Sequence, residues 1–473
     1  MTDSNPPHDL AIVGLGVMGA NLARNFASRG YRVGGYDRKP GMQARLRSLE
    51  PGEVGERLHV SADLKSMIGS LKRPRRVVVL VPSKFVDDAI DELAPLLEAD
   101  DVVVDAGNSL YEETARRHTR AQDAPWRFVG MGVSGGAEGA LRGPSMMPGG
   151  DVEAWGELQP LLESAAAKSE FGACVAHCGK GAAGHFVKMT HNGIEYGDMQ
   201  LLAETTRMLR AGLGLSATDA GDVFSRWNEG PLGSYLVEIT GKILRHSDPN
   251  GDGPLVDAIL DEAGQKGTGR WTVVAANELA VPVPTIAAAV DARVISSFRA
   301  SRQVRAGAVV AERGALKDVS QDDLEGALLL AKFASYAQGF RLMRGASEQF
   351  GFESNFAEIA RIWTAGCIIR ASLLRPIRDA LVEDPARALF DAPHFVSLVK
   401  AQLPKLRRVV AANALAGHPA PAFNASLGWV ESWTSARSTA NVIQAQRDYF
   451  GSHTYRRRDA PNMAVHTEWN TDA

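Results

Sequence analysis

Short apolar runs, separated by polar and glycine-rich stretches, mark the first third of the chain. They cover residues 10–13, 31–36, 77–81, 102–104 and 128–133. Their length is typical of strands, and the uniformly apolar, Val-rich runs suit strands buried on both faces of a parallel sheet. A helical pattern over residues 20–29, ended by Gly30, separates the first two runs.

The pattern changes after Gly184, where the strand signal fades. Ala, Leu and Ile then recur at helical spacing to about residue 440. We therefore predict an α/β protein, with a sheet-containing domain over residues 1–182 and a large all-helical domain over residues 183–440. Residues 441–473 form a basic, irregular tail, in which Tyr449, Phe450 and Tyr455 indicate that it packs on something.

Composition narrows the class of protein without naming it. The chain has 473 residues, 45% of them hydrophobic and 23% charged, which is ordinary for a soluble globular protein of two or three domains. A net charge of −3 gives no general attraction to nucleic acid or to an anionic membrane. The polar N-terminus, the absence of a long apolar run and only three cysteines favour a cytoplasmic enzyme without disulfides.

The first apolar run leads into a glycine-rich loop, Gly14-Leu15-Gly16-Val17-Met18-Gly19, followed by the helical pattern and the second run. This strand–loop–helix–strand context is what a dinucleotide-binding fingerprint requires. The glycines allow a tight turn and let backbone N–H groups approach a pyrophosphate at the helix N-terminus. The loop predicts that the N-terminal domain is a Rossmann-type NAD(P)-binding domain.

The end of the second predicted strand leaves the choice of cofactor open. Asp37 stands where an acidic residue takes the ribose hydroxyls of NAD, but Arg38 and Lys39 follow it at once. An arginine at this point accommodates the 2′-phosphate of NADP. Local chemistry therefore allows either cofactor or both.

One stretch, residues 184–202, concentrates polar side chains on a single helical face. At i, i+3, i+4, i+7 and i+8 stand Lys188, His191, Asn192, Glu195 and Tyr196. The alternative, a solvated polar face, fits less well because apolar residues crowd the same helix. Gly193 and Gly197 each cost about 1 kcal/mol of helix stability relative to Ala, so we expect something to approach the backbone closely there.

Further candidates follow predicted strands or glycine-rich turns. Asn108 and Ser109 follow the fourth strand, although Gly-Asn-Ser also suits an ordinary turn. A glycine-rich loop that begins at Ser134, Gly135 and Gly136 and continues to residue 150 offers backbone N–H groups to an anion, or is a set of turns.

In the helical region, Lys266 and Thr268 stand among three glycines, which suggests contact with a phosphate. Arg293 lies in an apolar-rich segment that could bury its charge, so we expect it to have a partner or a ligand.

With these motifs in hand, the chain resembles the decarboxylating 6-phosphogluconate dehydrogenases over nearly its whole length. The matching motifs are GLGVMGANL (14–22), VSGGAEGA (133–140), GPSMMPGG (143–150), GHFVKMTHNGIEYGDMQL (184–201), AGQKGTGRW (263–271) and QAQRDYFGSHTY (444–455). The resemblance implies oxidation of 6-phospho-D-gluconate, loss of CO2 to give ribulose 5-phosphate, and formation of NADPH in the pentose phosphate pathway, with no metal.

The resemblance also implies a role for each matching residue. Lys188 would be the general base and Glu195 the general acid. The sugar acid would be held by Asn108, Ser134, Gly135, Gly136, His191 and Asn192. The phosphate end would be held by Tyr196, Lys266, Thr268, Arg293, Arg447 and His453. The cofactor would be held by Gly14, Gly16, Val17, Met18, Gly19, Asp37, Arg38, Lys39, Val81 and Asn108. The family is a homodimer whose C-terminal tail completes the site of the partner subunit.

Three departures from the family pattern matter. The usual Asn-Arg-Thr after the second strand is Asp37-Arg38-Lys39, which leaves NAD, or both cofactors, as alternatives to NADP. The usual Lys-Ala-Gly is Pro-Ser-Lys at 82–84, and the usual Gly-Gly-Asn is Ala-Gly-Asn at 106–108. Neither change removes a catalytic group.

Two other functions stay open. A β-hydroxy acid dehydrogenase for a non-phosphorylated acid would lose little when Lys266 or Arg293 is truncated. A catalytically silent NAD(P)-binding protein would keep its cellular function after Lys188→Ala, but the presence of both base and acid argues against it.

Overall fold

A computed structural model describes residues 7–49, 52–309 and 312–469. Its contacts divide the chain into two compact units, Met1–Ser426 and Leu427–Ala473. The domain boundaries that the sequence predicts at residues 182 and 440 are not tested by this division and stay predictions.

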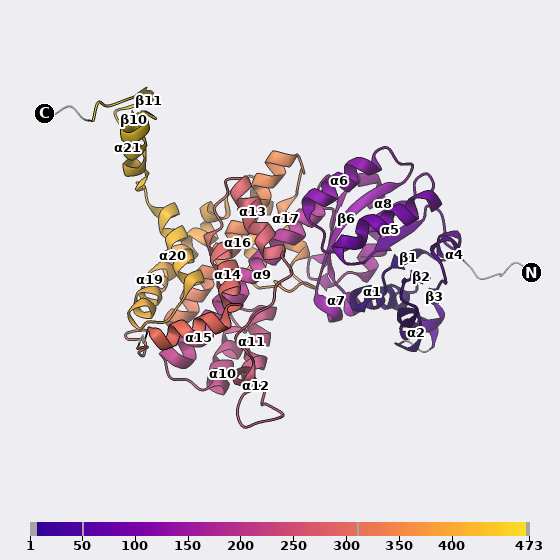
Figure 1. Cartoon of the computed structure of the whole chain (residues 1–473), viewed down its shortest axis with the longest axis horizontal. Coiled ribbons are helices and arrows are strands. Elements are labelled where there is room, and N and C mark those ends of the chain that lie inside the picture. The colour runs from indigo at the N-terminus through magenta and orange to yellow at the C-terminus, as the bar shows by residue number, and fades with distance from the viewer. Residues whose placement is uncertain (1–6, 50–51, 310–311, 470–473) are drawn as a thin grey trace, which may run out of the picture. The chain divides into compact units, whose positions relative to one another are not determined.

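The first unit begins with a seven-stranded sheet in the order β3-β2-β1-β4-β5-β6-β7. Strands β1, β2, β3 and β6 are labelled in Figure 1. Six strands are parallel, and β7 runs antiparallel to β6. The strands are β1 (Leu10–Val13), β2 (Val33–Tyr36), β3 (Leu58–Val60), β4 (Arg76–Val79), β5 (Val102–Asp105), β6 (Arg127–Ser134) and β7 (Ser145–Gly150). This is the strand order of a dinucleotide-binding fold, with its topological switch between β1 and β4.

Side chains of alternate strand residues point to opposite faces of the sheet, and each face has its own apolar core. Ile12 and Val104 belong to the core that includes α1 (Val17–Ser28) and α8 (Val152–Ala165). Val13 and Val103 belong to the core that includes α4 (Leu64–Gly69) and α5 (Val86–Leu93). Burial on both faces explains why these strands are uniformly apolar.

The remaining helices of this region are short connections. They are α2 (Pro40–Leu49), α3 (Glu53–Glu56), α6 (Tyr111–Ala121), α7 (Gly136–Arg142) and the 3₁₀ turns Ser83–Phe85 and Ala94–Leu96. A small hairpin, β8 (Lys168–Ser169) and β9 (Gly172–Ala173), precedes the helical region.

The expected glycine-rich loop from Ser134 to residue 150 is wrong. The chain forms α7 and then β7, whose six residues pair with β6. Pro148 and two terminal glycines hide this strand from a propensity argument. An edge strand tolerates proline because it has hydrogen bonds to make on one side only.

The helical region is confirmed and is built around α9 (Ala183–Arg207) and α16 (Gln321–Phe350), which pack together (Figure 1). The other helices are α10 (Ala217–Trp227), α11 (Tyr235–Arg245), α12 (Leu255–Ala258), α13 (Thr268–Glu278), α14 (Pro284–Ser296), α15 (Arg299–Ala308), α17 (Phe356–Ile362), α18 (Leu374–Glu383), α19 (Pro393–Leu415) and α20 (Pro421–Thr434), with a π turn at Met208–Gly212 and a 3₁₀ turn at Leu389–Asp391.

A buried ion pair joins α9 to α16. The Lys332 amine donates to a carboxylate oxygen of Asp198 at 2.6 Å, and both side chains are almost fully buried. The Tyr336 hydroxyl lies 3.4 Å from the same oxygen. Removing one member of such a pair would leave an uncompensated charge in the core.

The second unit is ordered, contrary to the expected irregular tail. Helix α21 (Ala440–Gly451) precedes a hairpin of β10 (Tyr455–Arg457) and β11 (Ala460–Val465). The buried Asp448 carboxylate ties them together by accepting from the Thr454 and Thr467 amides and from the Trp469 indole. The rings of Tyr449 and Tyr455 both lie 6.2 Å from the ring of Trp469, centroid to centroid, although Tyr449 and Phe450 are largely exposed.

Two further findings bear on the class of protein. In the part of the chain that the structure describes, no helix has both the length and the apolar character needed to cross a bilayer. The three cysteines are buried and free.

Candidate active site

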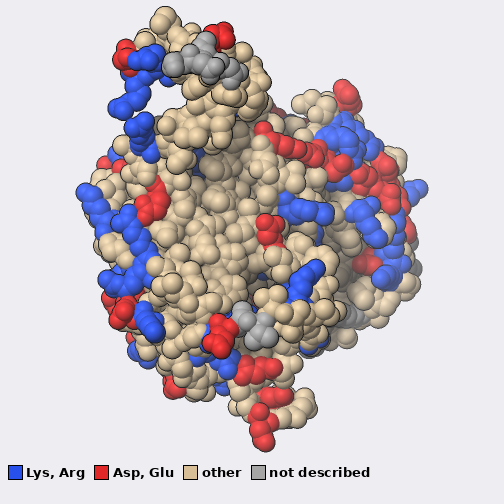
Figure 2. All heavy atoms as spheres, turned by 60° about the vertical axis from the view of Figure 1, so that its left-hand side comes forward, with Lys and Arg blue, Asp and Glu red and all other residues tan. Residues whose placement is uncertain are grey.

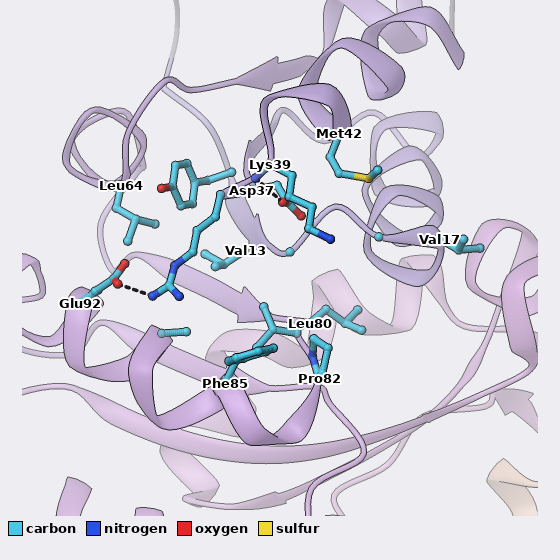
Figure 3. A pocket seen from close by; sticks show the side chains of 16 residues that line it. Val13, Val17, Asp37, Lys39, Met42, Leu64, Leu80, Pro82, Phe85 and Glu92 are labelled. Carbon is cyan, nitrogen blue, oxygen red and sulfur yellow. Dashed lines mark hydrogen bonds and ion pairs between the residues drawn. The ribbon is translucent and has the colours of Figure 1, made fainter. Parts of the chain in front are cut away.

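A cavity of 540 Å³ opens at the carboxyl ends of β1, β2 and β4, where the strand order reverses (Figure 3). Asp37, Lys39 and Met42 lie on one side of it, and Pro82 and Phe85 on the other. Ligands of open α/β sheets bind at this switch point.

The three glycines of the loop differ in what a side chain would meet. A Cβ at Gly14 would stand 2.6 Å from the Leu80 carbonyl oxygen, and one at Gly19 would stand 1.9 Å from the Gly14 oxygen. A Cβ at Gly16 would meet nothing within 4 Å. Gly14 and Gly19 therefore allow the tight turn and close helix–strand packing, while Gly16 keeps the backbone bare toward the cavity. This division fits a dinucleotide pyrophosphate at the start of α1.

Charged side chains gather beyond the end of β2. Asp37 accepts the Leu15 amide at 2.7 Å and the Lys39 amide at 2.8 Å. The Arg38 guanidinium forms an ion pair with Glu92 of α5, which the sequence analysis did not single out. Glu92 belongs to the lining of the cavity, although it lies 54 residues away along the chain.

The cavity brings together most of the residues predicted to hold the cofactor. Those that line it are Gly14, Gly16, Val17, Asp37, Arg38, Lys39 and Val81. Three others do not line it: Met18, Gly19 and Asn108.

The start of α9 is held against the sheet by backbone-to-backbone contact. A Cβ at Gly184 would stand 2.2 Å from the Gly130 oxygen of β6 and 2.4 Å from the Met147 oxygen of β7. One turn later, a Cβ at Gly132 would stand 2.3 Å from Cβ of Lys188. Glycines on both elements thus fix where the Lys188 side chain leaves the helix.

Lys188 is buried, with 8% of its surface exposed. Burial lowers the pKa of its amine, and the nearby Glu195 carboxylate partly opposes this shift. Among the residues that the structure describes, no side chain or carbonyl accepts a hydrogen bond from the amine. A buried amine of lowered pKa can act as a base once it loses its proton.

Glu195 stands two helical turns further along the same face. Its side chain is 23% exposed. Burial raises the pKa of the carboxyl group, against the opposing influence of Lys188 and Arg293. A raised pKa favours the protonated carboxyl group, so Glu195 is suited to donate a proton.

His191 lies between these two residues and is fully buried. Its Nε2 lies 3.0 Å from the Ser134 hydroxyl, and its Nδ1 lies 3.1 Å from Oδ1 of Asn192. Burial, with Lys188 nearby, holds the pKa of His191 well below its usual value. The ring is therefore neutral: Nδ1–H donates to Asn192 and Nε2 accepts from Ser134.

The expected close approach at the two glycines of α9 is confirmed, and its cause is helix packing. A Cβ at Gly193 would stand 2.6 Å from the Thr272 side chain of α13. A Cβ at Gly197 would stand 2.3 Å from the Ser335 hydroxyl of α16. Both glycines therefore let neighbouring helices pack closely against α9.

The residues proposed for a phosphate group lie around α13 and α14. The Arg293 guanidinium stacks on the Tyr196 ring, 3.8 Å from its centroid. Arg293 is half-buried. Thr268 is buried at the start of α13, and Lys266 is exposed in the loop before it.

The turn after β5 separates two candidates. Asn108 is exposed, whereas the Ser109 hydroxyl is buried and donates to Asp105 at 2.6 Å. Ser109 is therefore a structural residue of the turn. His185, which sequence reasoning missed, links α9 to this turn through the Gly107 carbonyl at 3.1 Å. Its place three residues before Lys188 was the only available signal.

The remaining substrate candidates divide between the two units. Gly135 is half-buried and Gly136 exposed, at the start of α7. Arg447 and His453 are exposed in the second unit. Within the described ranges, no group of three or more His, Cys, Asp and Glu side chains is arranged to hold a metal ion.

Comparison with known proteins decides the family. Residues 9–179 match the NAD binding domain of 6-phosphogluconate dehydrogenase, and residues 184–469 match the C-terminal domain of the same enzyme. The chain belongs to the 6-phosphogluconate dehydrogenase family. The resemblance seen in the sequence motifs is thereby confirmed.

Individual relatives agree over the full length. A decarboxylating 6-phosphogluconate dehydrogenase of Synechocystis is 46% identical, covering 97% of each chain. An NADP(+)-dependent one of Bacillus subtilis is 42% identical, covering 97% of this chain and 98% of its own. The 6-phosphogluconate dehydrogenase structure of Plasmodium falciparum superposes with a TM-score of 0.93 at 38% identity, covering 98% of this chain and all of that one.

Proposed function

We propose that the chain oxidises and decarboxylates 6-phospho-D-gluconate to D-ribulose 5-phosphate and CO2, with reduction of NADP, in the pentose phosphate pathway. The observation that carries this proposal is the pairing on α9 of a buried amine, Lys188, with a carboxyl group of raised pKa, Glu195. The proposed identity of the substrate rests on membership of the family.

Lys188 begins the reaction as the general base. Its neutral amine takes the proton of the C3 hydroxyl group, while NADP, when bound, accepts the hydride from C3. Desolvation makes the neutral amine accessible nearer to physiological pH, since a free lysine titrates at about 10.4. The product of this step is a 3-keto acid and a protonated Lys188.

The same two residues complete the decarboxylation. As the bond to the carboxylate breaks, the Lys188 ammonium returns its proton to the C3 oxygen and an enediol forms. Glu195 then protonates C2, which becomes C1 of ribulose 5-phosphate, and Lys188 takes the proton from the enediol hydroxyl group on the former C3. Seven residues separate the two on the helix, or about 10 Å along its axis, which their long side chains can span across a small sugar acid.

Neutral hydrogen-bonding groups are proposed to orient the sugar acid. Because His191 is neutral and bonded on both ring nitrogens, it adds no charge beside the reacting carbon. The Asn192 amide hydrogens face away from that bond and remain as donors. Ser134, Gly135, Gly136 and Asn108 would supply the remaining contacts.

A phosphate group is proposed to lie beyond Glu195. Arg293, stacked on Tyr196, presents its guanidinium at the polar face of α9, and Thr268 opens α13. Lys266 adds a flexible positive charge. Arg447 and His453 would arrive from the second unit of the partner subunit in a homodimer.

The proposed homodimer is supported by surface character. Figure 2 shows a broad, largely uncharged area on the face turned to the viewer. Large apolar side chains are exposed on α13 to α15 and just after them: Val274, Ile295, Phe298, Val304 and Val309. Exposed apolar surface of this kind marks interfaces.

Shared sites make a sharp test of the dimer. Lys188→Met and Arg447→Ala subunits, each inactive alone, are mixed after unfolding and refolded together. If each site takes Arg447 from the partner, random pairing restores about one quarter of wild-type activity, because half of the dimers regain one site. A mixture as inactive as its parts would contradict the shared site, as would full activity after deletion of residues 441–473.

NADP is proposed as the cofactor, with NAD used as well. The name of the Bacillus relative and the Plasmodium complex with NADP+ support NADP. Asp37, which can accept from ribose hydroxyl groups, supports use of NAD.

The decisive assay supplies purified protein with 6-phosphogluconate and each cofactor in turn. Reduced cofactor and CO2 should appear together in equal amounts. Failure with both cofactors would reject the proposal, and reduction without CO2 would point to a simple hydroxy acid dehydrogenase.

We propose the cytoplasm as the location. The free cysteines Cys174, Cys178 and Cys367 suit a reducing compartment.

A further inference from the structure

We propose that Glu92 tunes the choice between NADP and NAD by holding Arg38 away from a 2′-phosphate. The proposal rests on the proposed function only for the identity of the cofactors. Glu92 acts through Arg38, so it is a positioning residue and has no part in the chemical step.

The cavity has two ends of different character. Val17 and the glycine loop lie at one end, and Leu64 and Glu92 lie at the other (Figure 3). A pyrophosphate belongs at the glycine loop, so the adenosine part of a dinucleotide extends toward Glu92. The 2′-phosphate, which alone distinguishes NADP from NAD, therefore enters the region around Asp37 and Arg38.

Arg38 is already engaged in that region. Its guanidinium is paired with the Glu92 carboxylate, shown by the dashed line at Glu92 in Figure 3. The side chains are 55% and 47% exposed, so the pair is solvated and can open. An incoming phosphate must compete with Glu92 for the same guanidinium.

Asp37 adds to the difference between the cofactors. Two backbone amides hold its carboxylate in place, from Leu15 and Lys39. The carboxylate can accept ribose hydroxyl groups, but it repels a phosphate at the same carbon. Two carboxylates, Asp37 and Glu92, thus oppose the two cations Arg38 and Lys39. NAD has no 2′-phosphate and can bind while Arg38 stays paired with Glu92. The 2′-phosphate of NADP can pair with Arg38 only when Arg38 leaves Glu92.

A simple solvated helix face is the alternative explanation for Glu92. Helix α5 carries three other acids, and two of them pair elsewhere: Asp87 with Arg116 and Arg117, and Asp91 with Arg120. Of the four, Glu92 is the one whose side chain lines the cavity. Asp91 is therefore a matched control, since it has the same charge and is the next residue on the same helix.

The test uses two fragments that differ only by the phosphate in question, 2′,5′-ADP and 5′-AMP. Calorimetry gives the Kd of each for the full-length wild type, Glu92→Gln, Asp91→Asn, Arg38→Ala and the double variant Glu92→Gln/Arg38→Ala. Releasing Arg38 from an exposed ion pair should tighten 2′,5′-ADP by about two- to fivefold, with 5′-AMP unchanged. Asp91→Asn should alter neither, and Arg38→Ala should abolish the gain.

Three outcomes would overturn the proposal. Equal tightening of both fragments, or an equal effect of Asp91→Asn, would indicate a general field of the helix. A gain that persists with Arg38→Ala would show that Glu92 acts on the phosphate directly. No change with Glu92→Gln would show that the pair does not compete with the ligand.

Turnover of 6-phosphogluconate with NADP and NAD is measured separately on the same proteins. If the wild type turns over 6-phosphogluconate with neither cofactor, the proposed function is rejected. The role of Glu92 still stands in that case if Glu92→Gln tightens the binding of 2′,5′-ADP and not of 5′-AMP.

Discussion

The cofactor cavity and the polar face of α9 carry charge in opposite settings. At the cavity, Arg38 and Glu92 are about half exposed, and water screens their interaction. On α9, Lys188 is 8% exposed, and burial is the largest influence on its pKa. Changes at the cavity can therefore alter cofactor affinity by small amounts. On α9, burial instead determines whether the Lys188 amine is charged or neutral.

The largest effect, on kcat, is expected at Lys188, the buried charge of the two regions compared. Lys188→Met should lower kcat by about 10²- to 10⁴-fold, because it removes the proposed general base. The Kd of NADP should change little, since the cavity is left intact. Steady-state kinetics and calorimetry check the two halves.

Lys180→Met is the matched control for this prediction, because Lys180 is exposed and paired with Glu353 at the surface. It should leave kcat nearly unchanged. Loss of cofactor affinity in Lys188→Met would mean that the variant disturbs the fold, and near-normal turnover would remove Lys188 from the mechanism.

The next effect concerns stability. Lys332→Met leaves the Asp198 carboxylate buried without its partner, so the free energy of unfolding should fall by about 3–5 kcal/mol. Lys242→Met, which removes an exposed pair with Glu238, should cost at most about 1 kcal/mol. Urea unfolding of both variants gives the difference, and equal losses would contradict the contrast between buried and exposed charge.

Two glycines of one loop should separate binding from stability. Gly16→Ala places a methyl group in open space toward the cavity, so it should weaken NADP binding by about tenfold and leave stability unchanged. Gly19→Ala forces a methyl group against the Gly14 oxygen, so it should destabilise the protein by about 1–3 kcal/mol. Calorimetry and thermal unfolding distinguish the two, and a reversed pattern would exclude the assigned roles.

The smallest effect is a displacement of the pH profile. Glu195→Gln also removes the proposed general acid and so lowers kcat, and the small effect is read from the residual activity. The ionised Glu195 carboxylate raises the pKa of Lys188, so Glu195→Gln should lower that pKa further. Activity requires the neutral amine and is lost as pH falls through this pKa. The acid limb of kcat/KM should therefore move to lower pH, by at most about one unit. A shift to higher pH would mean that another group controls the limb.

The sequence could reveal what is local. The glycine loop and its flanking elements lie within thirty residues, and the polar face of α9 follows from helical period alone. The structure confirms the helix and the fold, while the assigned roles of the individual residues stay predictions.

Long-range pairing was beyond reach. The pair of Arg38 and Glu92 spans 54 residues, and the partner of Gly197, Ser335, lies on another helix. β7 was missed because its pairing with β6, and not its own residues, makes it a strand. Burial of Lys188 likewise depends on elements that lie far apart in the sequence, so no short stretch of the chain predicts it.

The glycine contact at the start of α9 has a consequence for how this scaffold can change. Where Gly184 touches the carbonyls of Gly130 and Met147, main chain abuts main chain, and the helix has no freedom to slide along the sheet. The position from which the Lys188 side chain leaves the helix is consequently fixed relative to β6 and β7. Adaptation to a longer or shorter sugar acid would therefore proceed at the proposed phosphate end, where α13 and α14 carry Thr268 and Arg293.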